Sequence, residues 1–328
     1  MFICTSLPAK NENDYHYNDR TRMIIIYFVK KINRISAMRS KFILFFCGSL
    51  FAFNVFSQSC ELAKDSSRIA VAGGSLTEII FLLGAQERIV AADITSNYPE
   101  QANSLPSIGY VRALSTEGIL SLEPTLIIGE DDMGPPSVLE QLSKTGVEIK
   151  VIPEEHSSQG IVDKILCIAA LLGETNSAKN ILNNEITPKI YELEKISEDI
   201  KSKNINIMFI LGMQSGSPLV AGKNTSADGF INMIGAKNIM TNFTGWKPVG
   251  AEAIINGSPD YILISKRGLK SFGDINELYN HPSLMFTPAA ENENIIVMDG
   301  MAMLGFSSRT ISSAIEIGQR FQINADEL

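Results

Sequence analysis

Tyr110 and Arg112 are the residues of this chain whose types and spacing most clearly suggest binding chemistry. They follow Gly109 in a loop, and a nearby guanidinium favours the phenolate form of a tyrosine, whose ordinary pKa is about 10. Phenolate is a hard anionic ligand that suits ferric iron, and tyrosine can be an axial ligand of haem. Arg112 could also bind a carboxylate such as a propionate through its fork of N–H donors. A turn aromatic without a ligand is the alternative for Tyr110, and the nearby Arg112 favours the ligand site.

Two glutamates, Glu117 and Glu252, occupy matching places in the two halves of the chain. Each opens a short predicted helix that a proline, Pro124 or Pro259, breaks at the same offset, and an apolar strand follows. Either glutamate alone would be an ordinary acid of a first helical turn, where the helix dipole favours negative charge. Together they indicate two similar lobes with matched carboxylates that engage arginines on a two-fold partner.

Strands and helices alternate along the chain, which predicts an α/β fold of two lobes with mostly parallel sheets. Apolar runs predict strands at Arg68–Ala72, Arg88–Ala92, Thr125–Gly129, Glu148–Ile152, Ile207–Leu211, Tyr261–Ser265 and Ile295–Asp299. Amphipathic spacing predicts helices at Ser75–Leu83 (capped by Ser75), Ser137–Lys144, Ile161–Leu172, Ala227–Ile234, Ile275–Tyr279 and Ser308–Phe321.

One long helix, bent at Pro188, is predicted over residues 175–204. A single helix between two lobes predicts a rigid connector, because a flexible hinge would be rich in glycine and serine. The N-terminal lobe is therefore expected at residues 58–174 and the C-terminal lobe at residues 205–328.

The first 57 residues have the pattern of a leader. A basic stretch begins at Met38, and the apolar run that follows to Phe56 has the length of a secretory core and is shorter than a membrane span. We expect a signal peptide at residues 38–57, cut after Ser57, preceded by an upstream extension at residues 1–37. An uncleaved anchor and a lipid on Cys60 are the alternatives. A Cys60–Cys167 disulfide is possible in an oxidising compartment, and structural or free thiols are the default expectation.

Composition excludes several classes of function. The chain has 328 residues and a net charge of −8, and removing the leader's 8 basic and 3 acidic residues makes the remainder more acidic, at −13. Such an excess of acid argues against nucleic-acid binding. The three histidines, His16, His156 and His281, lack zinc-site spacing, and no hydrolase motif is present. Gly73-Gly74-Ser75 is expected to be a tight strand–helix turn, with a smaller prospect of binding a ligand carboxylate.

The chain from Arg68 to Phe321 resembles the periplasmic haem-binding proteins of bacterial haem-uptake ABC transporters, within the class of substrate-binding proteins for cobalamin and iron-siderophores. The most specific element is the run from Ile108 to Leu122. Supporting elements are Val71–Glu78, Val220–Asp228 and Leu304–Arg309. The resemblance implies the class III fold, in which a long helix connects the lobes and lobe closure is small.

The resemblance also implies roles for individual residues. Tyr110 would be the axial ligand of ferric haem and Arg112 would support it, while Arg267 would be a second arginine across the cleft. Glu117 and Glu252 would dock on an inner-membrane ABC permease dimer with its ATPase. An outer-membrane haem receptor system would act upstream.

A single haem is expected, because the second-lobe loop at residues 212–216 has no histidine where some relatives bind a second haem. Within that loop, packing is favoured over weak iron ligation for Met213. We therefore predict a periplasmic haem carrier without catalytic activity. The alternatives are a siderophore or cobalamin binder, a chelatase-like enzyme that turns over a tetrapyrrole, and a receptor anchored through Cys60.

Overall fold

The computed structural model describes residues 60–326, with side chains through residue 323. The predicted extension at residues 1–37 and the predicted signal peptide at residues 38–57 lie outside the described residues. None of the helices within residues 60–326 combines the length and the apolar composition that a membrane span needs.

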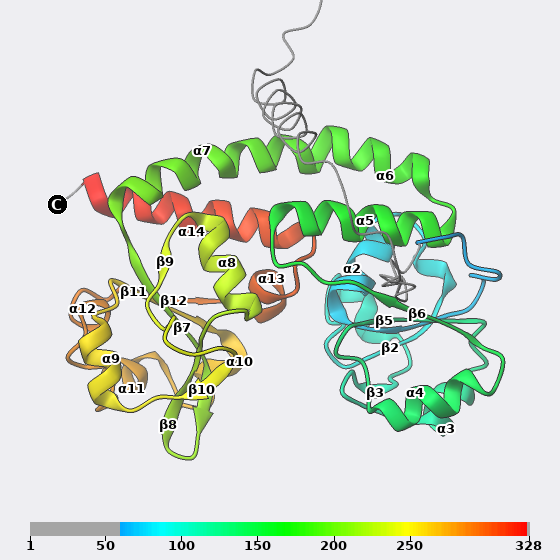
Figure 1. Ribbon diagram of the computed structural model, residues 1–328, viewed down its shortest axis with the longest axis horizontal. Helices are drawn as coiled ribbons and strands as arrows, with labels where there is room; N and C mark the ends of the chain where they lie inside the picture. Colours follow the sequence, from blue (N-terminus) through cyan, green and yellow to red (C-terminus); the bar gives the residue numbers. More distant parts are fainter. Residues whose placement is uncertain (1–59, 327–328) are drawn as a thin grey trace, which may run out of the picture. The chain divides into compact units, whose positions relative to one another are not determined.

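The first lobe, whose strands β2, β5 and β6 are labelled in Figure 1, is built on a parallel sheet of four strands. Their order is β2-β1-β5-β6. These strands are β1 (Ile69–Ala72), β2 (Ile89–Ala92), β5 (Leu126–Glu130) and β6 (Glu148–Ile152). Alternate residues of β1 face opposite sides, as strand geometry requires: Ile69 and Val71 join one hydrophobic cluster, and Ala70 and Ala72 join another. Both faces are therefore covered, which explains the nearly continuous apolar runs in the sequence.

Helices cover these two faces. They are α2 (Gly74–Leu82), α3 (Thr116–Leu120), α4 (Pro136–Ser143) and α5 (Ser158–Leu172). The prediction that Ser75 caps the first of them is wrong, because α2 begins at Gly74 with Gly73 as its N-cap and without a side-chain cap. Ser75 lies inside the helix, where its hydroxyl group hydrogen-bonds to Glu130.

The sheet of the second lobe is mixed, in the order β10-β8-β7-β11-β12 with β9 beside β7. Its strands are β7 (Asn206–Gln214), β8 (Ser217–Ala221), β9 (Lys237–Asn238), β10 (Trp246–Pro248), β11 (Tyr261–Ser265) and β12 (Ile295–Met298). β7, β11 and β12 are parallel, whereas β8 and β10 are antiparallel to their neighbours. The antiparallel hairpin was expected to be a glycine-rich loop. It forms because Ser215 and Gly216 both take positive φ, which suits a two-residue hairpin turn.

The second-lobe helices are α8 (Ser226–Ile234), α9 (Ala251–Gly257), α10 (Lys266–Leu269), α11 (Ile275–Tyr279), α12 (Pro288–Glu291), α13 (Gly300–Leu304) and α14 (Ser308–Asp326). The predicted second-lobe helices are confirmed as α8, α9, α11 and α14, whereas α10, α12 and α13 were not predicted.

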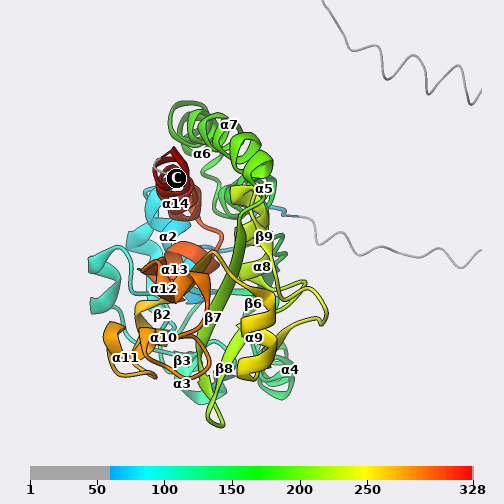
Figure 2. The same cartoon turned by 90° about the vertical axis from the view of Figure 1, so that its left-hand side faces the viewer.

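A long helical connector joins the lobes, as predicted, but it is not one uniform helix. It consists of α6 (Thr175–Ile181), a five-residue π-helical segment (Leu182–Ile186) and α7 (Thr187–Lys203). Pro188 lacks an N–H group and cannot donate the regular helical hydrogen bond, which accounts for the irregular turn before it. α7 packs along α14 in both views (Figures 1 and 2).

The lobes share one hydrophobic core and a polar junction. The core cluster runs from Ile69 in β1, through the connector, to Phe321 in α14. At the junction, Glu78 of α2 is only 5% exposed and accepts hydrogen bonds from Ser307 at 2.6 Å and from Arg309 Nε at 3.0 Å. These residues lie in two of the sequence elements that indicated the family, so those elements interlock across the lobes.

A disulfide joins Cys60 to Cys167 of α5, with the Cα atoms 5.0 Å apart. The default expectation of structural or free thiols is therefore wrong, and the disulfide alternative holds. The N–H group of Ala63 also donates to the carbonyl of Leu171 at 3.0 Å, so residues 60–63 lie against α5. The Cys60 sulfur is occupied by the disulfide, which leaves no thiol for a lipid anchor at this residue.

Candidate functional site

Tyr110 lies in a short hairpin at the carboxyl edge of the first-lobe sheet. The hairpin pairs β3 (Gly109–Tyr110) with β4 (Ala113–Leu114), and Val111 and Arg112 form its turn. The carboxyl edge of parallel strands is the usual ligand-binding edge of α/β sheets.

Backbone hydrogen bonds fix this hairpin on both sides. Ile94, just beyond β2, donates to the Gly109 carbonyl at 2.8 Å, and Gly134, just beyond β5, donates to the Val111 carbonyl at 2.9 Å. The Tyr110 side chain is half-buried against the cluster that contains Val111. The phenol is thus held by a supported backbone, which fits a preorganised ligand better than a loose turn aromatic.

Arg112 is exposed and forms an ion pair with Asp132, a residue that the sequence analysis did not identify as part of the site. Its Nε donates to Asp132 Oδ2 at 2.7 Å, and its Nη2 contacts the same oxygen. Partial burial acts to lower the pKa of Arg112, but Asp132, with smaller contributions from Tyr110 and Glu130, raises it above its ordinary value. The guanidinium therefore carries a full positive charge near Tyr110, and Asp132 partly offsets it.

Side chains accept the N–H groups of both glycines in the turn at the start of α2. Gly73 N–H donates to Asp93 Oδ1 at 3.0 Å, and Gly74 N–H donates to Thr95 Oγ1 at 2.9 Å. These two N–H groups are therefore not free to bind a ligand carboxylate.

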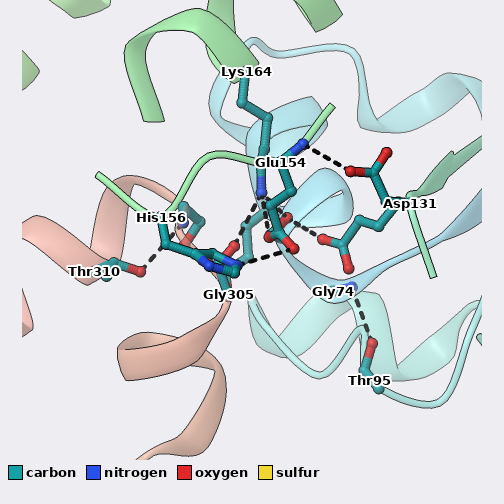
Figure 3. Close-up of polar contacts among 12 residues, drawn as sticks. Gly74, Thr95, Asp131, Glu154, His156, Lys164, Gly305 and Thr310 are labelled. Atoms are coloured by element: carbon teal, nitrogen blue, oxygen red, sulfur yellow. Dashed lines mark hydrogen bonds and ion pairs between the residues drawn. The ribbon is translucent and has the colours of Figure 1, made fainter. Parts of the chain in front are cut away.

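A buried charged cluster lies behind this edge of the sheet and reaches the second lobe (Figure 3). Lys164 of α5 is 1% exposed, and its ammonium donates to Glu154 at 2.9 Å, to Ser75 at 3.1 Å and to the Gly305 carbonyl at 3.2 Å. Glu130 accepts a hydrogen bond from Ser75 on the same side. This cluster joins α2, α5 and the end of β5 to the turn between α13 and α14.

The cluster contains two carboxyl groups whose pKa values move in opposite directions. Burial raises the pKa of Glu130 to about 7, although Lys164 acts to lower it. Burial also acts to raise the pKa of Glu154, but hydrogen bonds and charges from His156 and Lys164 lower it below its ordinary value. His156 packs on Phe306 with ring centroids 4.9 Å apart.

Glu117 and Glu252 occupy equivalent places in the two lobes. Each is exposed in the first turn of a short helix, α3 or α9. α3 leads into β5, which lies between β1 and β6, and α9 leads into β11, which lies between β7 and β12. The matching offset in the sequence therefore corresponds to a matching place in the topology.

Arg267 lies at the carboxyl edge of the second-lobe sheet, in the first turn of α10 directly after β11. Its side chain is exposed, and within residues 60–323 it makes no hydrogen bond or ion pair. The structure therefore leaves it available to a ligand but does not join it to Tyr110 or Arg112. Met213, in the same lobe, is half-buried near the end of β7. Within the described residues, no group of three or more histidine, cysteine, aspartate or glutamate side chains is arranged to hold a metal ion.

Comparison with known proteins places this geometry in a family. The sequence profile of the periplasmic binding protein family matches residues 69–302. Among solved structures, the periplasmic heme-binding protein RhuT from Roseiflexus sp. RS-1 is 33% identical, with a TM-score of 0.71, over 78% of this chain and 98% of that chain. The periplasmic heme-binding protein HutB of Vibrio cholerae is 35% identical, with a TM-score of 0.70, over 78% of this chain and 99% of that one.

A curated relative has a different named ligand. The vitamin B12-binding protein of Vibrio campbellii is 23% identical over 82% of this chain and 94% of its own length. The profile match, the two-lobe fold with its long helical connector and the similarity to both solved structures agree. This chain belongs to the periplasmic binding protein family.

Proposed function

We propose that this protein is a periplasmic carrier that binds one ferric haem and delivers it to an ABC transporter, without catalysing a reaction. Tyr110 is the axial ligand of the iron. Arg112 supports the phenolate and, with Arg267 of the other lobe, binds the propionates. The observation that carries the proposal is the placement of a half-buried tyrosine and an exposed arginine in one anchored hairpin at the ligand edge of the sheet.

The similarity to heme-binding proteins supports haem over other ligands of the family. The two solved relatives that bind heme are 33% and 35% identical to this chain, whereas the vitamin B12-binding relative is 23% identical. Chemistry favours the same choice, because ferric iron binds a phenolate oxygen well. Cobalamin is the second candidate, since a curated relative of nearly full length is named for it.

Competition between ligands tests this choice. Purified protein beginning at residue 58 is titrated with ferric haem, with cyanocobalamin and with a ferric siderophore, and the visible spectrum is recorded. We expect one equivalent of haem to give a saturable spectrum typical of tyrosinate-ligated ferric haem, and we expect the other two ligands not to displace it. Saturable binding of cobalamin, with only the spectrum of free haem, would favour the second candidate.

The transporter partner is proposed from the paired glutamates. A permease dimer with a two-fold axis presents equivalent arginines to both lobes, and exposed first-turn carboxylates suit such pairing. We expect the double variant Glu117→Lys and Glu252→Lys to bind haem as tightly as the wild type but to lose haem delivery to membranes that contain the transporter. Glu291→Lys is the matched control, because Glu291 is also an exposed acid in the first turn of a short helix. Normal delivery by the double variant would exclude this docking mode.

A further inference from the structure

Three consecutive acids end β5 or follow it directly, and each contacts a different part of the protein. Glu130 hydrogen-bonds to Ser75 in the buried cluster, Asp131 accepts the backbone N–H of Glu154 at 3.3 Å, and Asp132 accepts from Arg112 at 2.7 Å. The first two connect parts of the first lobe to one another. Only Asp132 reaches the hairpin that carries Tyr110.

The backbone holds Asp132 close to that hairpin. Just after it, Met133 N–H donates to the Glu130 carbonyl at 3.0 Å, which closes a turn. Gly134 then pairs with the hairpin on both sides of Arg112: its N–H donates to Val111 at 2.9 Å, and its carbonyl accepts from Leu114 at 2.9 Å. The acid and the arginine therefore sit on two segments that are hydrogen-bonded together, so their contact is preorganised.

The ion pair between Arg112 and Asp132 contributes little to the folding stability of the protein. The side chain of Arg112 is 61% exposed and that of Asp132 is 39% exposed. An exposed pair of this kind contributes little to folding, because solvent screens the charges. The larger effect of the ion pair is on the mobility of the Arg112 side chain. Without Asp132, this side chain would sample many rotamers and would have to be ordered when a ligand binds.

We propose that Asp132 is a positioning residue of the ligand site, which holds the Arg112 guanidinium in place beside Tyr110. The inference rests on the proposed function, because Arg112 supports the haem ligand there. The Asp132 carboxylate has two opposite effects on the binding of an anionic ligand. It orders Arg112, which strengthens binding, and its negative charge repels the ligand, which weakens binding. Substitutions can separate these effects.

The test compares Asp132→Asn with Asp132→Ala. Both variants lack the charge, but asparagine keeps an oxygen that accepts from Arg112 and alanine does not. We expect Asp132→Asn to bind ferric haem several-fold more tightly than Asp132→Ala, and at most roughly tenfold, because the rotamer freedom of one arginine limits the gain. In an Arg112→Ala background the two variants should bind equally, since no guanidinium remains to be held.

Controls separate this idea from general damage and from a wrong ligand. Asp131→Asn and Asp131→Ala should bind haem equally, and all variants should unfold at nearly the same denaturant concentration. Equal affinities of Asp132→Asn and Asp132→Ala, or a difference that persists without Arg112, would overturn the positioning role while leaving haem binding intact. A wild-type protein that gives only the spectrum of free haem would instead overturn the proposed function, and the positioning role with it.

Discussion

The buried cluster around Lys164 makes the stability of this protein depend on pH in a specific direction. The pKa of Glu130 is raised to about 7 in the folded protein, mainly by burial, against an ordinary value of 4.5. The folded state therefore binds a proton more tightly than the unfolded state does. The stability that this carboxyl group contributes is full below pH 4.5 and is lost as the pH rises through 7.

The size of this effect follows from the shift in pKa. One unit of pKa difference corresponds to about 1.4 kcal/mol, so the shift of Glu130 corresponds to a loss of about 2 to 3 kcal/mol between pH 5 and pH 8. Glu154 acts in a different window: its pKa is lowered by His156 and Lys164, so its contribution is lost as the pH falls below the ordinary range of a carboxyl group. Between pH 5 and pH 8 the contribution of Glu130 therefore dominates over that of Glu154.

The substitution Glu130→Gln isolates this contribution. Glutamine has nearly the same shape and can still accept from Ser75, but it does not titrate. Urea unfolding of the ligand-free wild type and variant at pH 5, 6, 7 and 8 gives the difference in unfolding free energy at each pH. We expect the wild type to lose about 2 to 3 kcal/mol relative to the variant across this range.

The control for this series is Glu140→Gln, an exposed acid paired with Lys144, whose difference from the wild type should stay nearly constant with pH. Two results would refute the account of a buried carboxyl group that binds a proton near pH 7. One is a difference in unfolding free energy between the wild type and Glu130→Gln that does not change with pH, and the other is a wild type that gains stability relative to Glu130→Gln as the pH rises.

Two further predictions concern the lobe junction and the disulfide. Arg309→Ala leaves the buried carboxylate of Glu78 without its cation and should lower the unfolding free energy by about 3 to 5 kcal/mol, whereas Arg309→Met combined with Glu78→Gln should cost clearly less. Equal losses in urea unfolding of the two proteins would contradict this. Reduction of the Cys60–Cys167 disulfide, which closes a loop of 107 residues, should lower the unfolding free energy by about 2 to 5 kcal/mol, and an unchanged unfolding midpoint in reductant would contradict it.

Much of the fold followed from local patterns in the sequence. β6 and β11 begin and end at the predicted residues, because their apolar runs are bounded by turns. The repeated spacing of glutamate and proline correctly placed Glu117 and Glu252 at equivalent points of the two lobes. The hairpin β7–β8 was missed because its polar and glycine-rich turn resembles a loop until the long-range pairing is known.

The polar network of the site was less accessible to sequence reasoning. Lys164 lies in a helix with an apolar pattern, and nothing in the spacing shows that its ammonium reaches Glu154 and the Gly305 carbonyl. Asp132 is one of three adjacent acids, and only the turn after β5 shows which of them contacts Arg112. A strand that ends in several acids near a predicted ligand loop is the signal that could have indicated this contact.

The central claim is that Tyr110 supplies the oxygen that binds the iron. The most direct measurement is the visible and electron paramagnetic resonance spectrum of ferric haem bound to Tyr110→Phe, beside the wild type and Tyr191→Phe. Tyr191 is an exposed tyrosine on α7 and serves as the matched control. We predict that the tyrosinate signature is present in the wild type and in Tyr191→Phe and is lost in Tyr110→Phe, with weaker haem binding. An unchanged spectrum in Tyr110→Phe would contradict the account.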